Sequence, residues 1–181
     1  MKKMIYTAAC VVAMAVAAQA QQKTSPVTIV SGWVQDNSKN KELLAKESFV
    51  KADEVGELGN GVIYLRETDF DEEVKTVQDL INLETKMFTL NKQGEVQIKD
   101  AGKITLADKK TTSILKYVTG ASDAKFQAIA YIPEKESVVT LTLSTYSKEF
   151  FDDHINDFRK MVSTYSKQAI VNPTVSESDL E

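Results

Sequence analysis

The residues best suited to nucleophilic or acid–base chemistry are few in this chain of 181 residues. It contains one histidine, His154, and one cysteine, Cys10. A catalytic triad needs a nucleophile, a base and a group that orients the base. The remaining nucleophile candidates are serines and threonines, and none lies in a nucleophile elbow or beside a zinc-protease motif. The sequence therefore favours a protein that is not an enzyme, and no catalytic residue is assigned.

His154 falls on or beside the apolar side of an amphipathic stretch that ends near Tyr165. An imidazole in such a place is more often a packed side chain with hydrogen-bonded ring nitrogens than a catalytic base. We therefore interpret His154 as a partly buried structural residue. Carboxylate pairs for glycoside hydrolysis are recognised by their separation in space, and the spacing along this sequence suggests no pair. A hydrolase that uses carboxylates or serine remains the least favoured alternative.

An acidic cluster offers the best metal-binding candidate in the sequence. Asp69, Asp71 and Glu73 alternate as the first ligands of a calcium loop do. The glycine at the sixth position and the closing glutamate of that loop are missing. Acidic residues at the start of a helix also complement the helix dipole without any metal. We expect no metal here.

A glycine cluster precedes the apolar run 62–65, with glycines at positions 56, 59 and 61. A phosphate-binding glycine loop must open a helix, because the helix N-terminus binds the anion. This cluster opens a predicted strand instead, and Asn60-Gly61 is a hairpin signal. We interpret the cluster as turn geometry and expect no cofactor.

Three aromatic residues, Trp33, Tyr64 and Tyr131, lie in or near predicted strands. They could line a groove for a small ligand. Aromatic residues in strands more often belong to a hydrophobic core. A small-ligand carrier with an aromatic groove near Trp33 is therefore an alternative hypothesis and not the leading one.

The N-terminus has the features of a secretory signal peptide. Lys2 and Lys3 precede an apolar run, residues 8–18, and Ala18-Gln19-Ala20 offers small residues at a cleavage site. We expect residues 1–20 to be removed by cleavage after Ala20, together with Cys10. A lipoprotein site ending at Cys10 is disfavoured because it would precede most of the apolar run. The expected location is the periplasm or the exterior of the cell.

Composition excludes several classes of partner. The formal charge of −4 becomes −6 when Lys2 and Lys3 are removed with the signal peptide. An acidic chain without a basic run disfavours nucleic acid and anionic membrane surfaces. No later apolar stretch is long enough for stable insertion into a membrane. The oligomeric state is left open.

The elements that would organise the fold are concentrated in residues 126–165. Alternating apolar and polar residues predict strands over 126–132 and 138–144, joined by a hairpin loop at 133–137. The period then changes to three and four, which predicts a helix with Ser147 as its N-cap. Its apolar side comprises Phe151, His154, Ile155, Phe158, Met161, Val162 and Tyr165.

The remaining chain predicts a single α+β domain over residues 21–165. We expect a strand over 27–34, a short helix and then a strand within 41–53, and a strand at 62–65. A long helix is expected to start at Asp69 with a capping box to Glu72 and to end within 91–94. Two or three strands follow from residue 95 to 118. Residues 166–181 are expected to form a flexible polar tail, and the fold of residues 41–58 is the least certain part.

This order of elements resembles the PsbP-like proteins, which include the extrinsic PsbP subunit of photosystem II and exported bacterial relatives of the DcrB type. The Gly32-Trp33 step and the strand–helix from Val138 to Tyr165 carry the resemblance. It departs slightly from the pattern at Ser163-Thr164-Tyr165, where Ser-Phe would be expected. The resemblance implies an α/β/α sandwich around a central, mostly antiparallel sheet. It also implies a non-enzymatic accessory role, with no functional residue that can be carried over.

We therefore hypothesise an exported, non-enzymatic accessory or binding module that acts on an envelope or periplasmic partner protein or another envelope component. No cofactor, metal or nucleic acid is expected.

Overall fold

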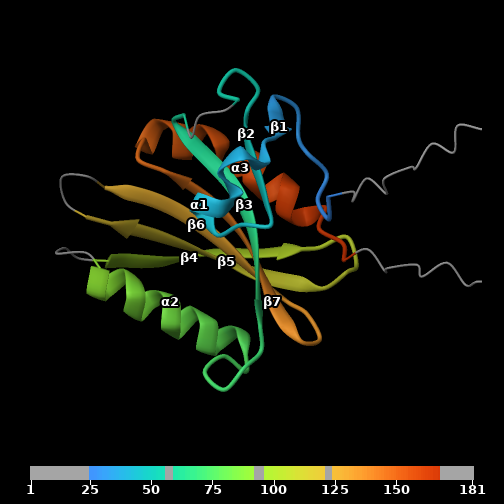
Figure 1. Cartoon of the computed structure of the whole chain (residues 1–181), viewed down its shortest axis with the longest axis vertical. Coiled ribbons are helices and arrows are strands. Elements are labelled where there is room, and N and C mark those ends of the chain that lie inside the picture. The colour runs from blue at the N-terminus through green and yellow to red at the C-terminus, as the bar shows by residue number, and fades with distance from the viewer. Residues whose placement is uncertain (1–24, 56–58, 92–95, 121–123, 168–181) are drawn as a thin grey trace, which may run out of the picture.

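The structure is a computed structural model that describes residues 25–55, 59–91, 96–120 and 124–167 (Figure 1). The predicted signal peptide, residues 1–20, lies outside the described residues. So do all but the first two residues of the predicted tail, 166–181.

One antiparallel sheet of seven strands forms the centre of the described fold. Its spatial order is β1-β2-β3-β7-β6-β5-β4, and every neighbouring pair is antiparallel. The strands are β1 (Trp33–Gln35), β2 (Glu47–Lys51), β3 (Gly61–Asp69), β4 (Val96–Thr105), β5 (Thr111–Thr119), β6 (Lys125–Pro133) and β7 (Ser137–Thr145). Strands β4 and β5 form a hairpin, and so do β6 and β7. Strands β1 and β2 are connected through η1 and α1, and α2 connects β3 to β4, which lies at the far edge of the sheet.

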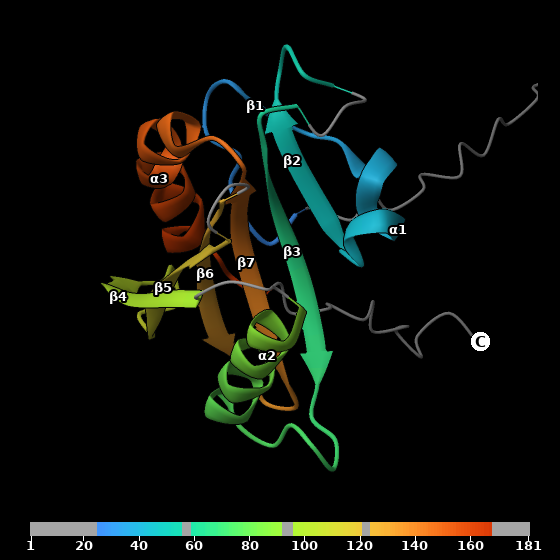
Figure 2. The same cartoon turned by 90° about the vertical axis from the view of Figure 1, so that its left-hand side faces the viewer.

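Helices cover both faces of the sheet (Figures 1 and 2). The helix α3 (Lys148–Ser163) packs on one face. The short α1 (Asn40–Leu43), preceded by the 3-10 turn η1 (Asn37–Lys39), and the longer α2 (Val77–Asn91) lie on the other. The predicted α/β/α sandwich with an antiparallel sheet is therefore confirmed. We call the two sides the α3 face and the α2 face.

The β6–β7 hairpin and α3 match the prediction closely. The backbone N–H of Glu134 donates to the carbonyl of Ser137, which closes the loop between the two strands at 2.9 Å. The hydroxyl of Ser147 accepts from the backbone N–H of Phe150 at 3.1 Å and caps α3 as expected. Both elements could be predicted because their apolar residues recur regularly, at every second position in the strands and at every third or fourth position in the helix.

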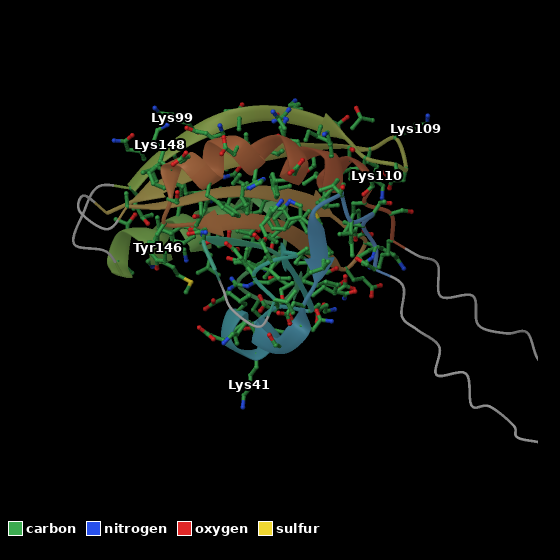
Figure 3. All side chains as sticks on the ribbon, turned by 90° about the horizontal axis from the view of Figure 1, so that it is seen from above. Lys41, Lys99, Lys109, Lys110, Tyr146 and Lys148 are labelled. Atoms are coloured by element: carbon green, nitrogen blue, oxygen red, sulfur yellow. The ribbon has the colours of Figure 1, made fainter. Side chains whose placement is uncertain are left out.

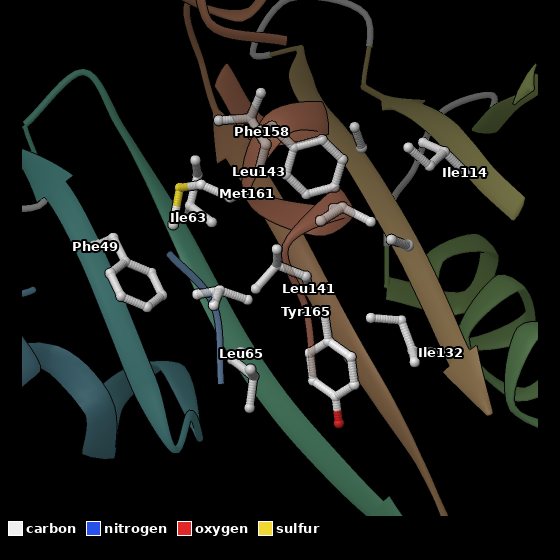
Figure 4. Close-up of a cluster of buried hydrophobic side chains, with 14 of the residues drawn as sticks. Phe49, Ile63, Leu65, Ile114, Ile132, Leu141, Leu143, Phe158, Met161 and Tyr165 are labelled. Atoms are coloured by element: carbon white, nitrogen blue, oxygen red, sulfur yellow. The ribbon is translucent and has the colours of Figure 1, made fainter. Parts of the chain in front are cut away.

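The core on the α3 face is apolar and densely filled (Figure 4). Alternate residues of β3, β6 and β7 point toward α3, and Phe158, Met161 and Val162 of the helix are fully buried against them. Burying a large apolar side chain stabilises the fold by roughly 1.5–3 kcal/mol before entropy is counted. The core residues labelled in Figure 4 are Phe49, Ile63, Leu65, Ile114, Ile132, Leu141, Leu143, Phe158, Met161 and Tyr165.

The prediction for the first strand is wrong over most of its length. Only Trp33–Gln35 forms β1, whereas Val27 to Val30 pack against the α3-face core without joining the sheet. The turn expected after Val34 contains η1 and the start of α1. Within residues 41–53 the expected short helix and strand are present as α1 and β2.

The predicted start of the long helix is also wrong. Asp69 is the last residue of β3, opposite Ser137, and α2 begins only at Val77. The helix is capped by Thr76, whose hydroxyl accepts from the backbone N–H of Asp79 at 3.2 Å and donates to its carboxylate at 2.8 Å. The predicted end of the helix agrees with its last residue, Asn91. Between 95 and 118 the structure has two strands, β4 and β5.

Candidate functional site

The α2 face of the sheet carries a buried layer of polar side chains. We call it the polar layer, and none of its members is more than 6% exposed. It consists of Tyr64 on β3, Tyr117 on β5, Gln127 and Tyr131 on β6, and Thr140, Thr142 and Ser144 on β7.

The register of the strands brings these side chains together. Thr142 of β7 lies opposite Tyr64, and Ser144 lies opposite Gln127. Directly opposed residues in an antiparallel pair point to the same face with neighbouring Cβ atoms. Gln127 is in turn opposite Tyr117 on β5, so the layer spans four strands. Sequence alternation predicted a common face for Thr140 and Thr142, but the meeting of the four strands requires their spatial order.

Helix α2 adds one carboxyl group to the polar layer. The hydroxyl of Tyr131 donates to Oε2 of Glu84 at 2.5 Å, and the hydroxyls of Tyr131 and Tyr117 are 3.0 Å apart. This chain of three groups links the helix to two strands. Sequence analysis missed Glu84, since it follows Leu83 on an otherwise amphipathic helix and gives no distinctive signal.

Burial controls the protonation of this group of side chains. Loss of solvation raises the pKa of Glu84, and the hydrogen bond from Tyr131 only partly opposes the effect. Burial, reinforced by the nearby Glu84 carboxylate, raises the pKa of the Tyr131 phenol far above its usual range. The phenol of Tyr131 therefore stays protonated and acts as a hydrogen-bond donor. The arrangement suits binding through hydrogen bonds better than nucleophilic attack.

Part of the polar layer has no hydrogen-bond partner. The Oε1 atom of Gln127 is buried and unpaired. The Tyr64 phenol, by contrast, is hydrogen-bonded to the side chains of Thr142 and Gln127. Buried polar atoms are paired in most native structures, so an unpaired acceptor calls for an explanation.

Helix α2 covers this face with little buried area of its own. Leu80 is the only buried residue among the described side chains of α2, whereas α3 has five. Toward its C-terminal end, Met87 and Leu90 are 51% and 74% exposed. On the same face, Arg66 holds the end of α1 by donating to the carbonyl of Leu43 from Nε at 2.9 Å and from Nη2 at 2.5 Å.

His154 lies in a separate cluster on the α3 face. Its Nδ1 is 3.2 Å from Oδ2 of Asp157, and the same oxygen accepts from the indole N–H of Trp33 at 3.3 Å. The imidazole ring packs edge-on against Trp33 and Phe150. His154 is thus partly buried as predicted, although the predicted hydrogen bonding of both ring nitrogens is seen only at Nδ1. Its contacts fasten β1 to α3.

The three aromatic residues proposed to line one groove do not share a face. Trp33 belongs to the α3-face core, while Tyr64 and Tyr131 lie on the α2 face. Trp33 is also only 4% exposed. The three residues therefore do not line one groove, although two of them belong to the polar layer.

The acidic and glycine clusters have structural roles. Asp71 accepts hydrogen bonds from the backbone N–H groups of Glu73 and Val74, both at 2.8 Å. No group of three or more potential metal-ligating side chains occurs among the described residues. A Cβ on Gly61 would come within 2.4 Å of the Phe150 ring, so this glycine permits close packing. Gly56 lies outside the described residues.

The β4–β5 hairpin, residues 96–119, forms a distinct surface at one edge of the sheet. Among the described residues, no strand pairs with the outer side of β4. The hairpin contains five lysines and two aspartates, a formal charge of +3 in a chain whose total is −4. Figure 3 shows Lys99 near one end of the hairpin and Lys109 and Lys110 near the other. Lys99 lies directly opposite Lys116, a pairing of like charges that is unfavourable by itself.

The edge strand is bent near its middle. The pairing of β4 with β5 shifts register between Asp100 and Lys103, and Gly102 adopts a positive φ of 89°. Nη1 of Arg159 on α3 donates to the carbonyl of Ala101 at 3.0 Å, so the bend is fastened to the helix. Lys99 and Lys103 lie on either side of this bend, and neither forms an ion pair with the described residues.

No helix in the described parts of the chain is long and apolar enough to cross a membrane.

Comparison with known proteins supports the fold but no closer relationship. No protein-family model matches the chain, and no curated protein matches it. The chain is similar to the solution structure of cyanobacterial PsbP (CyanoP) from Synechocystis sp. PCC 6803, with a TM-score of 0.51 and 16% identity over 76% of this chain and 83% of that chain. A Pseudomonas aeruginosa protein of unknown function covers 82% of this chain at 12% identity, with a TM-score of 0.45, and 88% of its own chain is matched. The sandwich described above is therefore a PsbP-like fold.

Proposed function

We propose that this protein is an exported, non-enzymatic accessory module that binds a partner protein in the cell envelope through its β4–β5 hairpin. The observation that carries the proposal is the open, positively charged edge strand. An exposed strand edge offers unpaired backbone groups to an incoming extended segment, and side-chain charge then selects the partner.

The charge of the hairpin favours an acidic segment. Lys99 and Lys103 have no carboxylate partner among the described residues, and Lys99 faces Lys116 across the pair of strands. An acidic strand laid beside β4 would relieve this repulsion. Lysines and a bend at an edge also discourage pairing between copies of one chain, which fits selection of a different partner.

A non-enzymatic role is supported by the use that the fold makes of its reactive side chains. The single histidine fastens Trp33 and Phe150 through packing and its contact with Asp157. The phenols of Tyr117 and Tyr131 have raised pKa values and serve as hydrogen-bond donors. The signal-peptide features of residues 1–20 support export.

Site-specific photocrosslinking in the native host tests the proposal. A photoreactive side chain at exposed Gln97 on β4 should produce a defined adduct, and sequencing should map it to an acidic, extended segment of one envelope protein. The same probe at exposed Lys41 on α1 is the matched control. Lys99→Glu together with Lys103→Glu should reduce the adduct at least tenfold, whereas Lys41→Glu should not. A partner segment that is basic or helical, or an adduct unaffected by the charge reversals, would contradict the proposal.

A further inference from the structure

The polar layer raises a question that the proposed partner surface does not answer. Strands β3, β6 and β7 present apolar side chains to α3, whereas their α2 face combines buried polar side chains with the apolar Val62, Ile129 and Val138. Burying hydroxyl and amide groups costs free energy unless each one finds a hydrogen-bond partner. An apolar set on the α2 face would satisfy the fold equally well, as the α3 face demonstrates.

We propose that the polar layer is a binding site for a small, uncharged, hydroxyl-rich compound such as a sugar, and that α2 is the element that moves to admit it. The proposal is independent of the partner surface on the β4–β5 hairpin. It rests on one buried acceptor without a partner, Oε1 of Gln127, on the chemistry around it and on the small number of buried side chains with which the helix above it packs.

The unpaired oxygen of Gln127 defines which hydrogen-bonding group a ligand must supply. Oε1 of Gln127 can only accept a hydrogen bond, so a ligand has to present a donor to it. The hydroxyl of Ser144 lies on the residue directly opposite Gln127, and it can both donate and accept. A sugar hydroxyl also does both, so one such group can satisfy an amide oxygen and a neighbouring hydroxyl together.

The charges around the layer disfavour an ionic ligand. The guanidinium of Arg66 is already engaged with the carbonyl of Leu43 and lies over the Tyr64 ring, with Cζ 4.8 Å from its centroid. The carboxyl of Glu84 already accepts from Tyr131. Neither group is left to compensate a buried ion, and an uncompensated buried charge is costly. The three tyrosine rings add apolar surface of the kind that lines small-molecule sites.

Access to the layer depends on α2. Leu80 is the only buried apolar side chain among those described on the helix, and its polar links to the sheet are the hydrogen bonds of Glu84 with Tyr131 and of Thr85 with Tyr117. Elements with few buried contacts are those that open most easily. Displacement of α2 would expose Tyr117, Tyr131 and Gln127 while the α3-face core stays intact.

An NMR titration of the purified protein tests this inference. The probes are D-glucose, N-acetyl-D-glucosamine and maltose at millimolar concentrations, with backbone amide shifts as the readout. At least one sugar should shift resonances of β6, β7 and α2 in a saturable way. Gln127→Met keeps a similar shape but removes the amide, and it should weaken binding by about tenfold, as expected for one lost hydrogen bond. Gln35→Met, at an exposed position on β1, is the matched control and should bind as the parent does.

Two outcomes would overturn the inference. The first is the absence of any saturable shift in the parent protein, which would leave the layer as a site for ordered water only. The second is unchanged binding in Gln127→Met. If that variant does not fold, Ser144→Ala removes the opposing hydroxyl at a smaller change in volume, and the same weakening is expected.

Discussion

The two faces of the sheet are built from the same strands but differ in the polarity of the side chains that they bury. On the α3 face, alternate residues of β3, β6 and β7 are apolar and meet the buried side of an amphipathic helix. On the α2 face, the intervening residues include six of the seven members of the polar layer, and the helix above them is half exposed. The difference indicates that the α3 face holds the fold together, while the α2 face is free to carry another task.

Truncating one phenylalanine on each face should separate their contributions most clearly. Phe158→Ala empties a fully buried site on α3 and should cost about 3–5 kcal/mol of unfolding free energy. Phe88→Ala on α2 removes a partly buried ring whose centroid lies 5.1 Å from that of the Tyr117 ring. This change should lower the unfolding free energy by about half as much as Phe158→Ala does. Urea denaturation followed by circular dichroism measures both. Equal losses would mean that α2 is as firmly docked as α3.

Adding a single methyl group tests how tightly the α3 face is packed. Gly61→Ala places a Cβ within 2.4 Å of the Phe150 ring and should cost about 1–3 kcal/mol through overpacking. The loss should shrink in a Phe150→Leu background, because the clashing ring is gone. Unfolding free energies of the four proteins in this double-mutant cycle provide the measurement. An undiminished loss in the Phe150→Leu background would place the strain elsewhere.

The hydrogen-bonded chain under α2 can be broken by removing one atom. Tyr131→Phe deletes the hydroxyl that joins Glu84 to Tyr117 and should cost about 1–2 kcal/mol, because the buried carboxyl loses its donor. Amide hydrogen exchange should accelerate more in α2 than in α3, where it should rise only as far as the lower global stability requires. Tyr146→Phe, at an exposed position, is the control and should alter neither helix. Equal acceleration in both helices after Tyr131→Phe would contradict separate roles for the two faces.

Carboxyl groups on the two faces should respond to pH with opposite sign. On the α3 face, hydrogen bonds from Lys46 and Ser137 lower the pKa of Glu67 from 4.5 to about 2. Its contribution to stability is therefore present above pH 4.5 and is lost as the pH falls toward 2. Glu67→Gln should cost about 1 kcal/mol at neutral pH, allowing for solvent screening of a partly exposed pair, and almost nothing at pH 2. A loss that does not vary between these two pH values would contradict the assignment.

Glu84 should show the smallest effect and the reverse dependence. Burial raises its pKa above 4.5, so the folded state holds the proton more tightly than the unfolded state. Its favourable contribution is complete below pH 4.5 and declines as the pH rises through the raised pKa. Glu84→Gln cannot ionise and should gain stability relative to the parent protein as the pH rises. Midpoints of urea unfolding at several pH values measure this gain, and a gain on acidification would contradict it.

Sequence patterns predicted the α3 side of the molecule and failed where tertiary contacts decide. The β6–β7 hairpin and α3 could be predicted because every second strand residue and every third or fourth helix residue is apolar. The spacing of Asp69 and Glu72 predicts a helix start, but the pairing of Asp69 with Ser137 extends β3 instead. Thr76 and Asp79 carry an equivalent capping signal, and the helix begins there. The apolar residues from Val27 to Val30 predict a strand, yet Val27, Ile29 and Val30 pack on the core without pairing.

The polar layer could be predicted only in part. Alternation in β7 places Thr140 and Thr142 on one face, and that much follows from the sequence. The contribution of Gln127, Tyr64 and Tyr117 depends on the order β3-β7-β6-β5, which connects strands far apart in the chain. Glu84 joins them from α2, and the spacing of a single glutamate on a helix says nothing about what it faces.

The first described segment, near Pro26, and the last, near Ser166, are joined by hydrogen bonds at the C-terminal end of α3. The backbone N–H of Ser166 donates to the carbonyl of Pro26 at 2.9 Å, and the backbone N–H of Thr28 donates to the hydroxyl of Thr164 at 2.8 Å. A fold whose ends meet in this way is a candidate for circular permutation. Joining residue 167 to residue 25 with a short glycine-rich linker, and opening the chain in the loop between β6 and β7, would leave every layer of the sandwich intact. The new termini of such a rearranged chain would lie at one end of the central strands β6 and β7, where tethers could be attached.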